Sequence, residues 1–132
     1  MRKEFARLML EVGENDNRLV VLVGDIGVFG LREFWKKYPE RFYNIGVCEQ
    51  SIISIASGIA LAGLIPVVHS IAPFITERCF EQIKDDFCYQ GLGGNIVSVG
   101  SAFDYAGLGC THHTYSDIAI LRSLPNTEIV YP

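Results

Sequence analysis

The sequence predicts an α/β domain, a three-layer α/β/α arrangement with a mostly parallel, doubly wound sheet. Short β-branched runs alternate along the chain with segments of helical periodicity. Such alternation of strands and helices is typical of parallel sheets that carry helices on both faces. At 132 residues the chain is long enough for one domain of this kind and too short for two, so residues 1–132 are expected to form a single unit.

The expected elements follow in chain order. The first helix is indicated by apolar residues at helical spacing that end at a glycine, namely Phe5, Leu8, Met9, Val12 and Gly13. A β-branched run over 19–23 is typical of a central parallel strand. After it we expect a helix over 31–38, a strand over 41–45, a helix over 49–62, a strand over 65–69, a helix opening at Pro73, a strand over 95–100, a helix capped by Ser116-Asp117 and a last strand over 127–130.

Charge and composition disfavour nucleic acid and membrane as partners. The net charge is −4 and no Lys/Arg cluster is present, so binding to phosphate backbones is not expected. Residues 50–76 carry no charged side chain, but glycines and prolines interrupt them, which fits a helix, a turn and a buried strand better than a membrane span. The charged N-terminal pattern is unlike a signal peptide, and a cytoplasmic location is expected.

Two further features bear on partners and redox state. The apolar fraction of 49% is high for a small domain, so we expect another chain to cover part of its surface. The four cysteines, Cys48, Cys79, Cys88 and Cys110, show neither a CxxC pair nor a spacing typical of zinc. They are expected to be buried, reduced thiols.

Candidate functional residues lie where the predicted strands end, because ligands of parallel sheets bind beyond the carboxyl ends of the strands. Glu49 stands at a strand-to-helix junction ahead of an apolar helix. It can be an acid favoured by the helix dipole, or a desolvated carboxyl that stays protonated and acts as a proton donor or strong hydrogen-bond partner. Phe74 is either a core aromatic or a flat face for a planar heterocycle. Arg78 lies four residues on, on the same helical face, and can equally pair with a neighbouring glutamate.

Two loops complete the expected site. His112 and His113 lie in a glycine-rich loop without metal-ligand partners nearby, so we expect donors to substrate oxygens and no metal site on this chain. Asp25 lies in a Gly-Asp-Ile-Gly turn after the first strand. This turn lacks the GxGxxG fingerprint, which disfavours a Rossmann-type oxidoreductase.

In their order along the chain, these motifs resemble the pyrimidine-binding domain of the transketolase family, the C-terminal section of transketolase-like proteins. This family includes deoxyxylulose phosphate synthase and the beta subunits of 2-oxo acid dehydrogenases. The matching segments are Gly46-Val47-Cys48-Glu49-Gln50, the apolar stretch over 58–66, the set Phe74, Arg78 and Gln82, the loop Gly109-Cys110-Thr111-His112, and the stretch Leu-Arg-Ser-Leu-Pro-Asn over 121–126.

The resemblance implies a thiamine diphosphate site. Glu49 would be the catalytic carboxylate that hydrogen-bonds the aminopyrimidine and promotes its imino form, and Phe74 would stack on that ring. Arg78 and Asp25 would also lie at the cofactor. His112 would contact substrate and take part in catalysis, with His113 as a substrate-binding neighbour. Mg²⁺ and the diphosphate would be bound mainly by a partner domain or subunit.

The resemblance also implies an activity, the transfer of a two-carbon ketol unit between sugar phosphates by a homodimer or heterotetramer. Three alternatives stay open: a deoxyxylulose phosphate synthase-like enzyme, a 2-oxo acid dehydrogenase beta-like component acting on a 2-oxo acid, and a non-catalytic assembly module of the same fold. Members of this family continue beyond the point that matches Pro132, so we expect the domain to be truncated at its C-terminal end.

Overall fold

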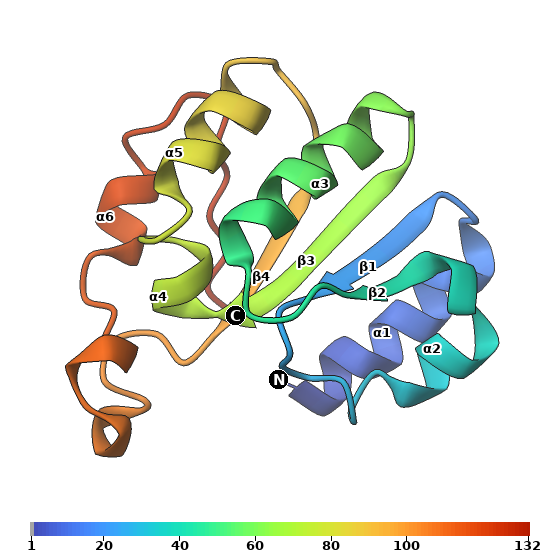
Figure 1. Ribbon diagram of the computed structural model, residues 1–132, viewed down its shortest axis with the longest axis horizontal. Coiled ribbons are helices and arrows are strands. Elements are labelled where there is room, and N and C mark those ends of the chain that lie inside the picture. The colour runs from blue at the N-terminus through green and yellow to red at the C-terminus, as the bar shows by residue number, and fades with distance from the viewer. Residues whose placement is uncertain (1) are drawn as a thin grey trace.

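Four parallel strands form the centre of the fold in the computed structural model, which describes residues 2–132 (Figure 1). They are β1 (Leu19–Val23), β2 (Phe42–Asn44), β3 (Ile65–Ile71) and β4 (Asn95–Val99), arranged in the order β2-β1-β3-β4. Every neighbouring pair is parallel. The predicted α/β class with a parallel sheet is therefore confirmed.

Helices and turns connect the strands, mostly as the sequence predicts. The helices are α1 (Arg2–Asn15), α2 (Arg32–Lys37), α3 (Glu49–Leu61), α4 (Ala72–Ile75), α5 (Phe80–Gln82) and α6 (Asp117–Leu121). Short 3-10 turns are η1 (Pro39–Arg41), η3 (Ala106–Leu108) and η4 (Cys110–His112), and η2 (Ile83–Cys88) is π-helical. No helix within residues 2–132 is both long and apolar enough to cross a bilayer.

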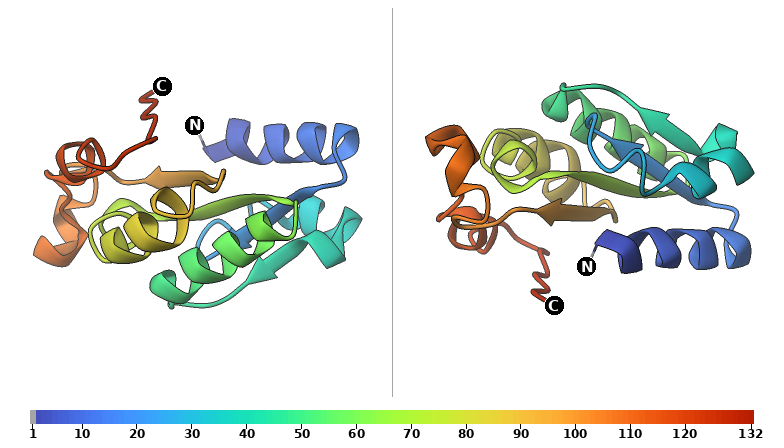
Figure 2. Two further views of the ribbon diagram at one scale, coloured as in Figure 1. Left: turned by 90° about the horizontal axis from the view of Figure 1, so that it is seen from above. Right: turned by 90° about the horizontal axis from the view of Figure 1, so that it is seen from below.

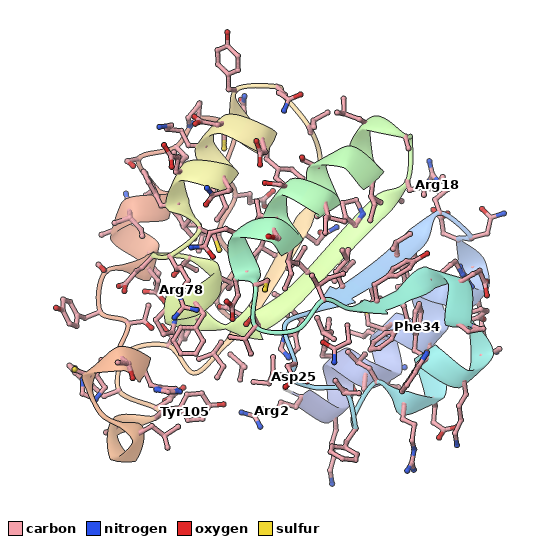
Figure 3. The ribbon with its side chains drawn as sticks, in the orientation of Figure 1. Arg2, Arg18, Asp25, Phe34, Arg78 and Tyr105 are labelled. Carbon is pink, nitrogen blue, oxygen red and sulfur yellow. The ribbon has the colours of Figure 1, made fainter. Side chains whose placement is uncertain are left out.

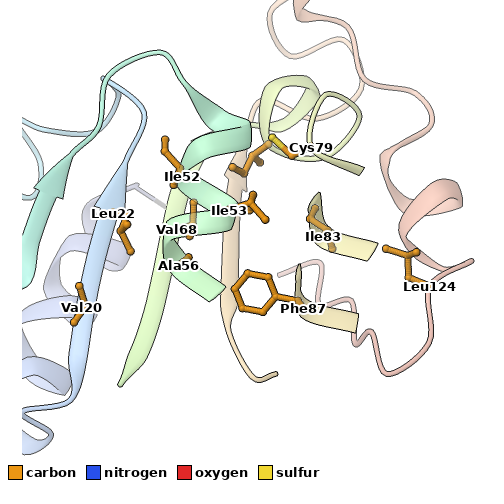
Figure 4. Close-up of a cluster of buried hydrophobic side chains, with 11 residues drawn as sticks. Val20, Leu22, Ile52, Ile53, Ala56, Val68, Cys79, Ile83, Phe87 and Leu124 are labelled. Atoms are coloured by element: carbon orange, nitrogen blue, oxygen red, sulfur yellow. The ribbon is translucent and has the colours of Figure 1, made fainter. Parts of the chain in front are cut away.

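The two faces of the sheet carry separate cores, because successive side chains of a strand point to opposite sides. Val20 and Leu22 of β1 face α3, α5 and η2 in one cluster (Figure 4). Leu19, Val21 and Val23 face α1 and α2 in the other. Figure 2 shows α1 on one side of the sheet and α3 on the other. Burial on both faces explains why β1 is an uninterrupted apolar run.

Three details differ from the sequence-based expectations. The segment 127–130 is not a strand: Asn126 adopts a φ of 58°, and the chain then crosses toward the side that carries α1, without pairing with β4 (Figure 2). The helix opening at Pro73 is interrupted after Ile75 and resumes at Phe80. Ser116 is the N-cap residue of α6, but its hydroxyl donates to Glu77 and accepts no hydrogen bond from the N–H groups of the helix.

Strand order fixes where a ligand can bind. From β1 the chain moves to β2 on one side, and from β3 it moves to β4 on the other. The loops that leave β1 and β3 therefore diverge, which opens a crevice beyond the carboxyl ends of these two central strands. The sheet topology thus points to the loop after β1, the start of α3 and the segment after β3.

A tight contact between α1 and α2 gives a testable consequence of this packing. A Cβ atom added at Gly13 would lie 2.7 Å from Cε2 of Phe34, a side chain with 0% exposure. We expect Gly13→Ala to destabilise the fold by about 1–3 kcal/mol, because overpacking outweighs the gain of about 1 kcal/mol in helix propensity. Gly58→Ala in α3 is the matched control, since nothing lies within 4 Å of its added Cβ, and it should stabilise. Urea unfolding of both variants tests this, and equal effects would contradict it.

Candidate functional site

The buried carboxylate of Glu49 lies at the centre of the carboxyl edge of the sheet. Gly46 takes a φ of 79° after β2, and the chain then enters α3 with Glu49 in its first turn. Glu49 is 1% exposed. Its Oε2 accepts a hydrogen bond from Nη1 of Arg78 at 2.9 Å, and its Oε1 accepts a longer one from Oγ of Ser70 at 3.3 Å.

The ion pair revises the sequence-based picture of an isolated, apolar environment around Glu49. Arg78 contacts this carboxylate and not the neighbouring Glu77 or Glu81. Its side chain is 40% exposed, so the guanidinium spans the space between the buried carboxylate and solvent. A buried charge that is paired in this way is compensated where it lies, so a protonated, uncharged Glu49 is not required to explain its burial.

Arg78 joins Glu49 to an aromatic group. The guanidinium carbon lies 4.3 Å from the ring centroid of Phe74, a cation–π contact. The ring of His112 meets Phe74 edge-on, with centroids 5.0 Å apart, and Nδ1 of His112 is hydrogen-bonded to Oγ1 of Thr111 at 3.0 Å. The structure thus brings together four of the residues that the sequence singles out: Glu49, Phe74, Arg78 and His112.

The break between α4 and α5 positions two of these side chains. Where the helix is interrupted, side chains satisfy the backbone: Oγ1 of Thr76 donates to the carbonyl of Ala72 at 2.7 Å. Sγ of Cys79 donates to the carbonyl of Phe74 at 3.1 Å. Because the irregular turn is hydrogen-bonded by buried groups, Phe74 and Arg78 are held by a fixed segment and not by a loose loop.

Asp25 lies at the same edge but outside this cluster. It adopts a φ of 56°, its backbone N–H donates to Oδ1 of Asn44, and its carboxylate accepts from Nδ2 of Asn44 at 3.1 Å. In Figure 3, Asp25, Arg78, Arg2 and Tyr105 gather at the end of the molecule where the strands end. The contacts of Asp25 join the ends of β1 and β2.

His113 does not join the cluster around Phe74. Its ring packs edge-on against Phe103 at a centroid distance of 5.0 Å, and its Nε2 is buried without a hydrogen-bond partner among residues 2–132. An antiparallel bridge between Ala102 and Thr114 closes the loop that carries both histidines. Adjacent residues in this loop therefore point toward different surroundings, His112 to Phe74 and His113 to Phe103.

Sequence reasoning missed two residues at this site. Ser70 alternates with His69 on β3, so it faces Glu49 while His69 faces α1. Tyr105 packs at the other end of the loop, 6.3 Å from the His112 ring. The position of Ser70 shortly before Phe74, at the carboxyl end of a predicted strand, is the signal that could have identified it.

A small cavity lies on the opposite face of β3. It has a volume of about 250 Å³ and is lined by His69, Phe5, Arg2 and the loop after β1. Nδ1 of His69 donates to the carbonyl of Val97 at 2.8 Å. Burial lowers the pKa of His69, partly opposed by this hydrogen bond, so the ring is neutral near pH 7.

The cysteines are all free thiols, but only part of the expectation of burial holds. Cys79 is buried and Cys88 half-buried, whereas Cys48 and Cys110 are exposed. Among residues 2–132 no three His, Cys, Asp or Glu side chains are grouped so that they could hold a metal ion.

A protein-family model described as "Transketolase, pyrimidine binding domain" matches residues 1–132. The chain belongs to this family. The resemblance drawn from the sequence motifs is thereby confirmed. A transketolase pyrimidine-binding domain implies thiamine diphosphate as cofactor. The observed side chains fit the pyrimidine ring of that cofactor, since a buried carboxylate and a half-buried aromatic ring both contact the Arg78 guanidinium.

Two relatives of this transketolase-type domain are longer than this chain. An apulose-4-phosphate transketolase subunit of Actinobacillus succinogenes is 35% identical over 120 residues, which are 90% of this chain and 39% of that protein. The putative transketolase C-terminal section of Methanocaldococcus jannaschii is 35% identical over 133 residues, 100% of this chain and 42% of that protein. The chain therefore spans about two fifths of the length of these relatives.

A solved structure agrees with the family at the level of the fold. The protein described as "Split gene transketolase, inactive beta4 tetramer" superposes with a TM-score of 0.81 and 32% sequence identity, covering 95% of this chain and 40% of that one. That neighbour is described as a tetramer from a split gene, and the relative from Actinobacillus succinogenes is named as one subunit of a transketolase.

The buried thiol beside the transketolase-type site predicts a dependence of stability on alkaline pH. Burial, helped by the Glu49 carboxylate and opposed by Arg78, raises the pKa of Cys79 to about 12. In the unfolded chain the pKa of a cysteine thiol is about 8.5. The contribution of Cys79 to the free energy of unfolding is therefore complete below that pH and is lost as the pH rises toward 12. Between pH 8 and pH 10 we expect a loss of about 1–2 kcal/mol from this group.

Urea unfolding at the two pH values, on the wild type and on Cys79→Ala, measures this contribution. The variant starts from a lower stability, because a buried side chain is shortened, but its stability should fall less with pH. Cys110→Ala, an exposed cysteine, is the control and should keep the wild-type slope. The same pH dependence in wild type and Cys79→Ala would contradict the assignment.

Proposed function

We propose that this chain is the pyrimidine-binding part of a thiamine diphosphate enzyme that transfers a two-carbon ketol unit between sugar phosphates. The observation that carries the proposal is the buried Glu49 carboxylate, which contacts the same Arg78 guanidinium as the half-buried ring of Phe74 at the carboxyl edge of a parallel sheet. Membership of the transketolase pyrimidine-binding family and a relative named as a sugar-phosphate transketolase subunit support it.

Each side chain of the cluster has a role in this proposal. Glu49 would hold the aminopyrimidine through a hydrogen bond between its carboxyl group and a ring nitrogen, and Ser70 would orient that carboxyl group through Oε1. Phe74 would bind a ring face. Nδ1 of His112 is hydrogen-bonded to Thr111, so its second ring nitrogen, Nε2, would be the one that contacts a substrate oxygen. When bound, the cofactor supplies the carbon nucleophile that adds to the carbonyl group of a ketose.

Asp25 and His113 have supporting roles in the proposal. Asp25, tied to Asn44 at the ends of β1 and β2, would shape the edge of the cofactor site. His113 packs on Phe103 within the same loop as His112, so its contact with substrate would require the partner or the substrate to approach from that side. Arg78 already contacts both the carboxylate of Glu49 and the ring of Phe74.

The proposed activity requires a second polypeptide or domain. In the proposal, a partner binds Mg²⁺ and the diphosphate group, and the assembly is a homodimer or heterotetramer. Large apolar side chains at the surface support such a partner. The most exposed near the carboxyl edge are Phe29 (91%), Tyr115 (80%), Val47 (65%), Leu108 (60%) and Phe103 (58%).

A non-catalytic assembly module of the same fold is the second candidate. One observation favours it, since a solved structural neighbour is described as an inactive tetramer of beta subunits. The Glu49 cluster distinguishes the two candidates, because a module that only assembles has no need of a buried carboxylate and an aromatic ring that share one guanidinium.

The decisive variant is Glu49→Gln, studied in the natural protein together with its diphosphate-binding partner. It keeps the shape of the side chain but removes the charge, and we expect ketol transfer to fall by about 10²–10⁴-fold, the usual range for loss of proton-transfer catalysis. The measurement is the rate of ketol transfer between sugar phosphates. Glu81→Gln, an exposed glutamate on α5, is the matched control and should keep wild-type activity.

Thermal unfolding of both variants separates a loss of chemistry from a loss of folding. A folded Glu49→Gln complex with full activity would favour the assembly module. Robust ketol transfer by this chain without any partner would contradict the proposed division of labour between two polypeptides.

A further inference from the structure

Arg78 makes the two contacts that the proposed function assigns to the cofactor ring. Its Nη1 donates to Oε2 of Glu49 at 2.9 Å, and its guanidinium carbon lies 4.3 Å from the centroid of Phe74. One planar group therefore covers both the carboxylate and the aromatic face. Within residues 2–132, Glu49 is the only hydrogen-bond partner of the Arg78 side chain.

A guanidinium group resembles an aminopyrimidine in the features that this site can recognise. Both are flat and both stack on an aromatic ring. Both can also donate to a carboxylate, the guanidinium through its N–H groups and the aminopyrimidine through its amino group or a ring nitrogen that carries a proton. A heterocycle that meets Phe74 and Glu49 together has to enter the space between them. That space is where the guanidinium lies.

We propose that Arg78 is a stand-in for the cofactor ring: in the free protein it compensates Glu49 and covers Phe74, and it has to leave both before the ring binds. This inference rests on the proposed function. The Arg78 side chain is 40% exposed and Glu49 is buried, so Arg78 is the partner that moves, outward into solvent. Rotation about the side-chain bonds of Arg78 is sufficient for this movement, so the hydrogen-bonded turn between α4 and α5 keeps its conformation.

The stand-in role explains why the site is stable without its ligand. An unpaired carboxylate with 1% exposure is strongly unfavourable, and Ser70 contributes only one long hydrogen bond of 3.3 Å. Arg78 removes that penalty in the free protein. Once the ring has replaced it, the carboxylate is again hydrogen-bonded, so Glu49 is compensated in both states.

Two other roles for Arg78 make different predictions. If Arg78 is a ligand of the bound cofactor, its loss weakens binding. If it stays on Oε2 while the ring uses Oε1, its loss leaves the association rate unchanged. A stand-in that has to leave slows association, so its removal speeds association.

The test uses the natural protein in complex with its diphosphate-binding partner, and thiamine diphosphate with Mg²⁺ as the probe. Arg78→Met removes the N–H donors and keeps an apolar stem, and we expect its association rate, measured by stopped-flow fluorescence, to rise at least fivefold. Arg32→Met, an arginine of α2 that pairs with Glu33 at the surface, is the matched control and should bind at the wild-type rate. Slower or unchanged association of Arg78→Met would overturn the stand-in.

A second measurement on the wild type keeps the proposal testable if Arg78→Met does not fold. Nitrogen NMR of the arginine side chains reports rotation about the Nε–Cζ bond, with the Arg78 signal assigned from Arg78→Lys. Rotation should be slow while the guanidinium is bound to Glu49 and become fast when the probe is added. A guanidinium that stays immobile in the loaded complex would overturn the proposal.

The outcomes for the two proposals are distinct. A wild-type complex that binds no thiamine diphosphate at all counts against the proposed function itself. Binding by the wild type with no gain in association rate for Arg78→Met and no release of the guanidinium counts against the stand-in alone.

Discussion

The burial of one carboxylate is the constraint on which the carboxyl edge of this sheet depends. Glu49, in the first turn of α3, has 1% of its surface exposed and faces Ser70 of β3. Leaving such a group without its partner costs about 3–5 kcal/mol in measured cases, a large part of the stability of a small domain. The fold therefore has to deliver a cation and a hydroxyl to this point, and both come from β3 and the segment after it.

The irregular segment after β3 follows from that requirement. Arg78 reaches the carboxylate while its guanidinium lies on Phe74, and between them α4 ends and a short turn leads to α5. A broken helix leaves carbonyl groups unpaired, so buried side chains have to satisfy them. Thr76 and Cys79 do so, and the thiol of Cys79 thereby comes to lie beside the ion pair. Its raised pKa is a consequence of the same arrangement.

Most of the fold and much of the candidate site could be predicted from the sequence, because both depend on local pattern. The β-branched run of β1 is a local signal, and the structure agrees with it. Phe74 and Arg78 do contact each other, but not on one helical face as expected, because α4 ends at Ile75 and Arg78 lies in the turn before α5. The partner of Arg78 could not be predicted, since Glu77 and Glu81 are closer in sequence than Glu49. The helix α3 follows β2, and β2 and β3 both pair in parallel with β1. These long-range pairings bring the start of α3 to the end of β3.

Long-range pairing also decides the elements that the sequence predicted wrongly. The alternation over 127–130 is compatible with a strand, but a strand exists only if a partner edge runs alongside it. After Asn126 the chain crosses β4 and leaves an apolar groove of about 450 Å³, lined in part by Ile96, Leu121 and Val130. Cys48 and Cys110 are exposed because Cys48 is the N-cap residue of α3 and Cys110 begins the short turn η4, and neither lies inside a long helix or strand.

The distribution of charge at this edge bears on how a ligand enters. The innermost charged groups, Glu49 and Arg78, neutralise each other, and the groups around them are aromatic, with His112 on Phe74 and Phe103 stacked near Tyr115. An edge of this kind attracts anions weakly by itself, since its central cation is already paired. Affinity for a diphosphate-bearing ligand then has to come from the partner, and what this edge contributes is the selection of a flat ring with N–H donors. The exchange of one planar donor for another at Glu49 would let that selection occur without exposing a bare carboxylate at any stage.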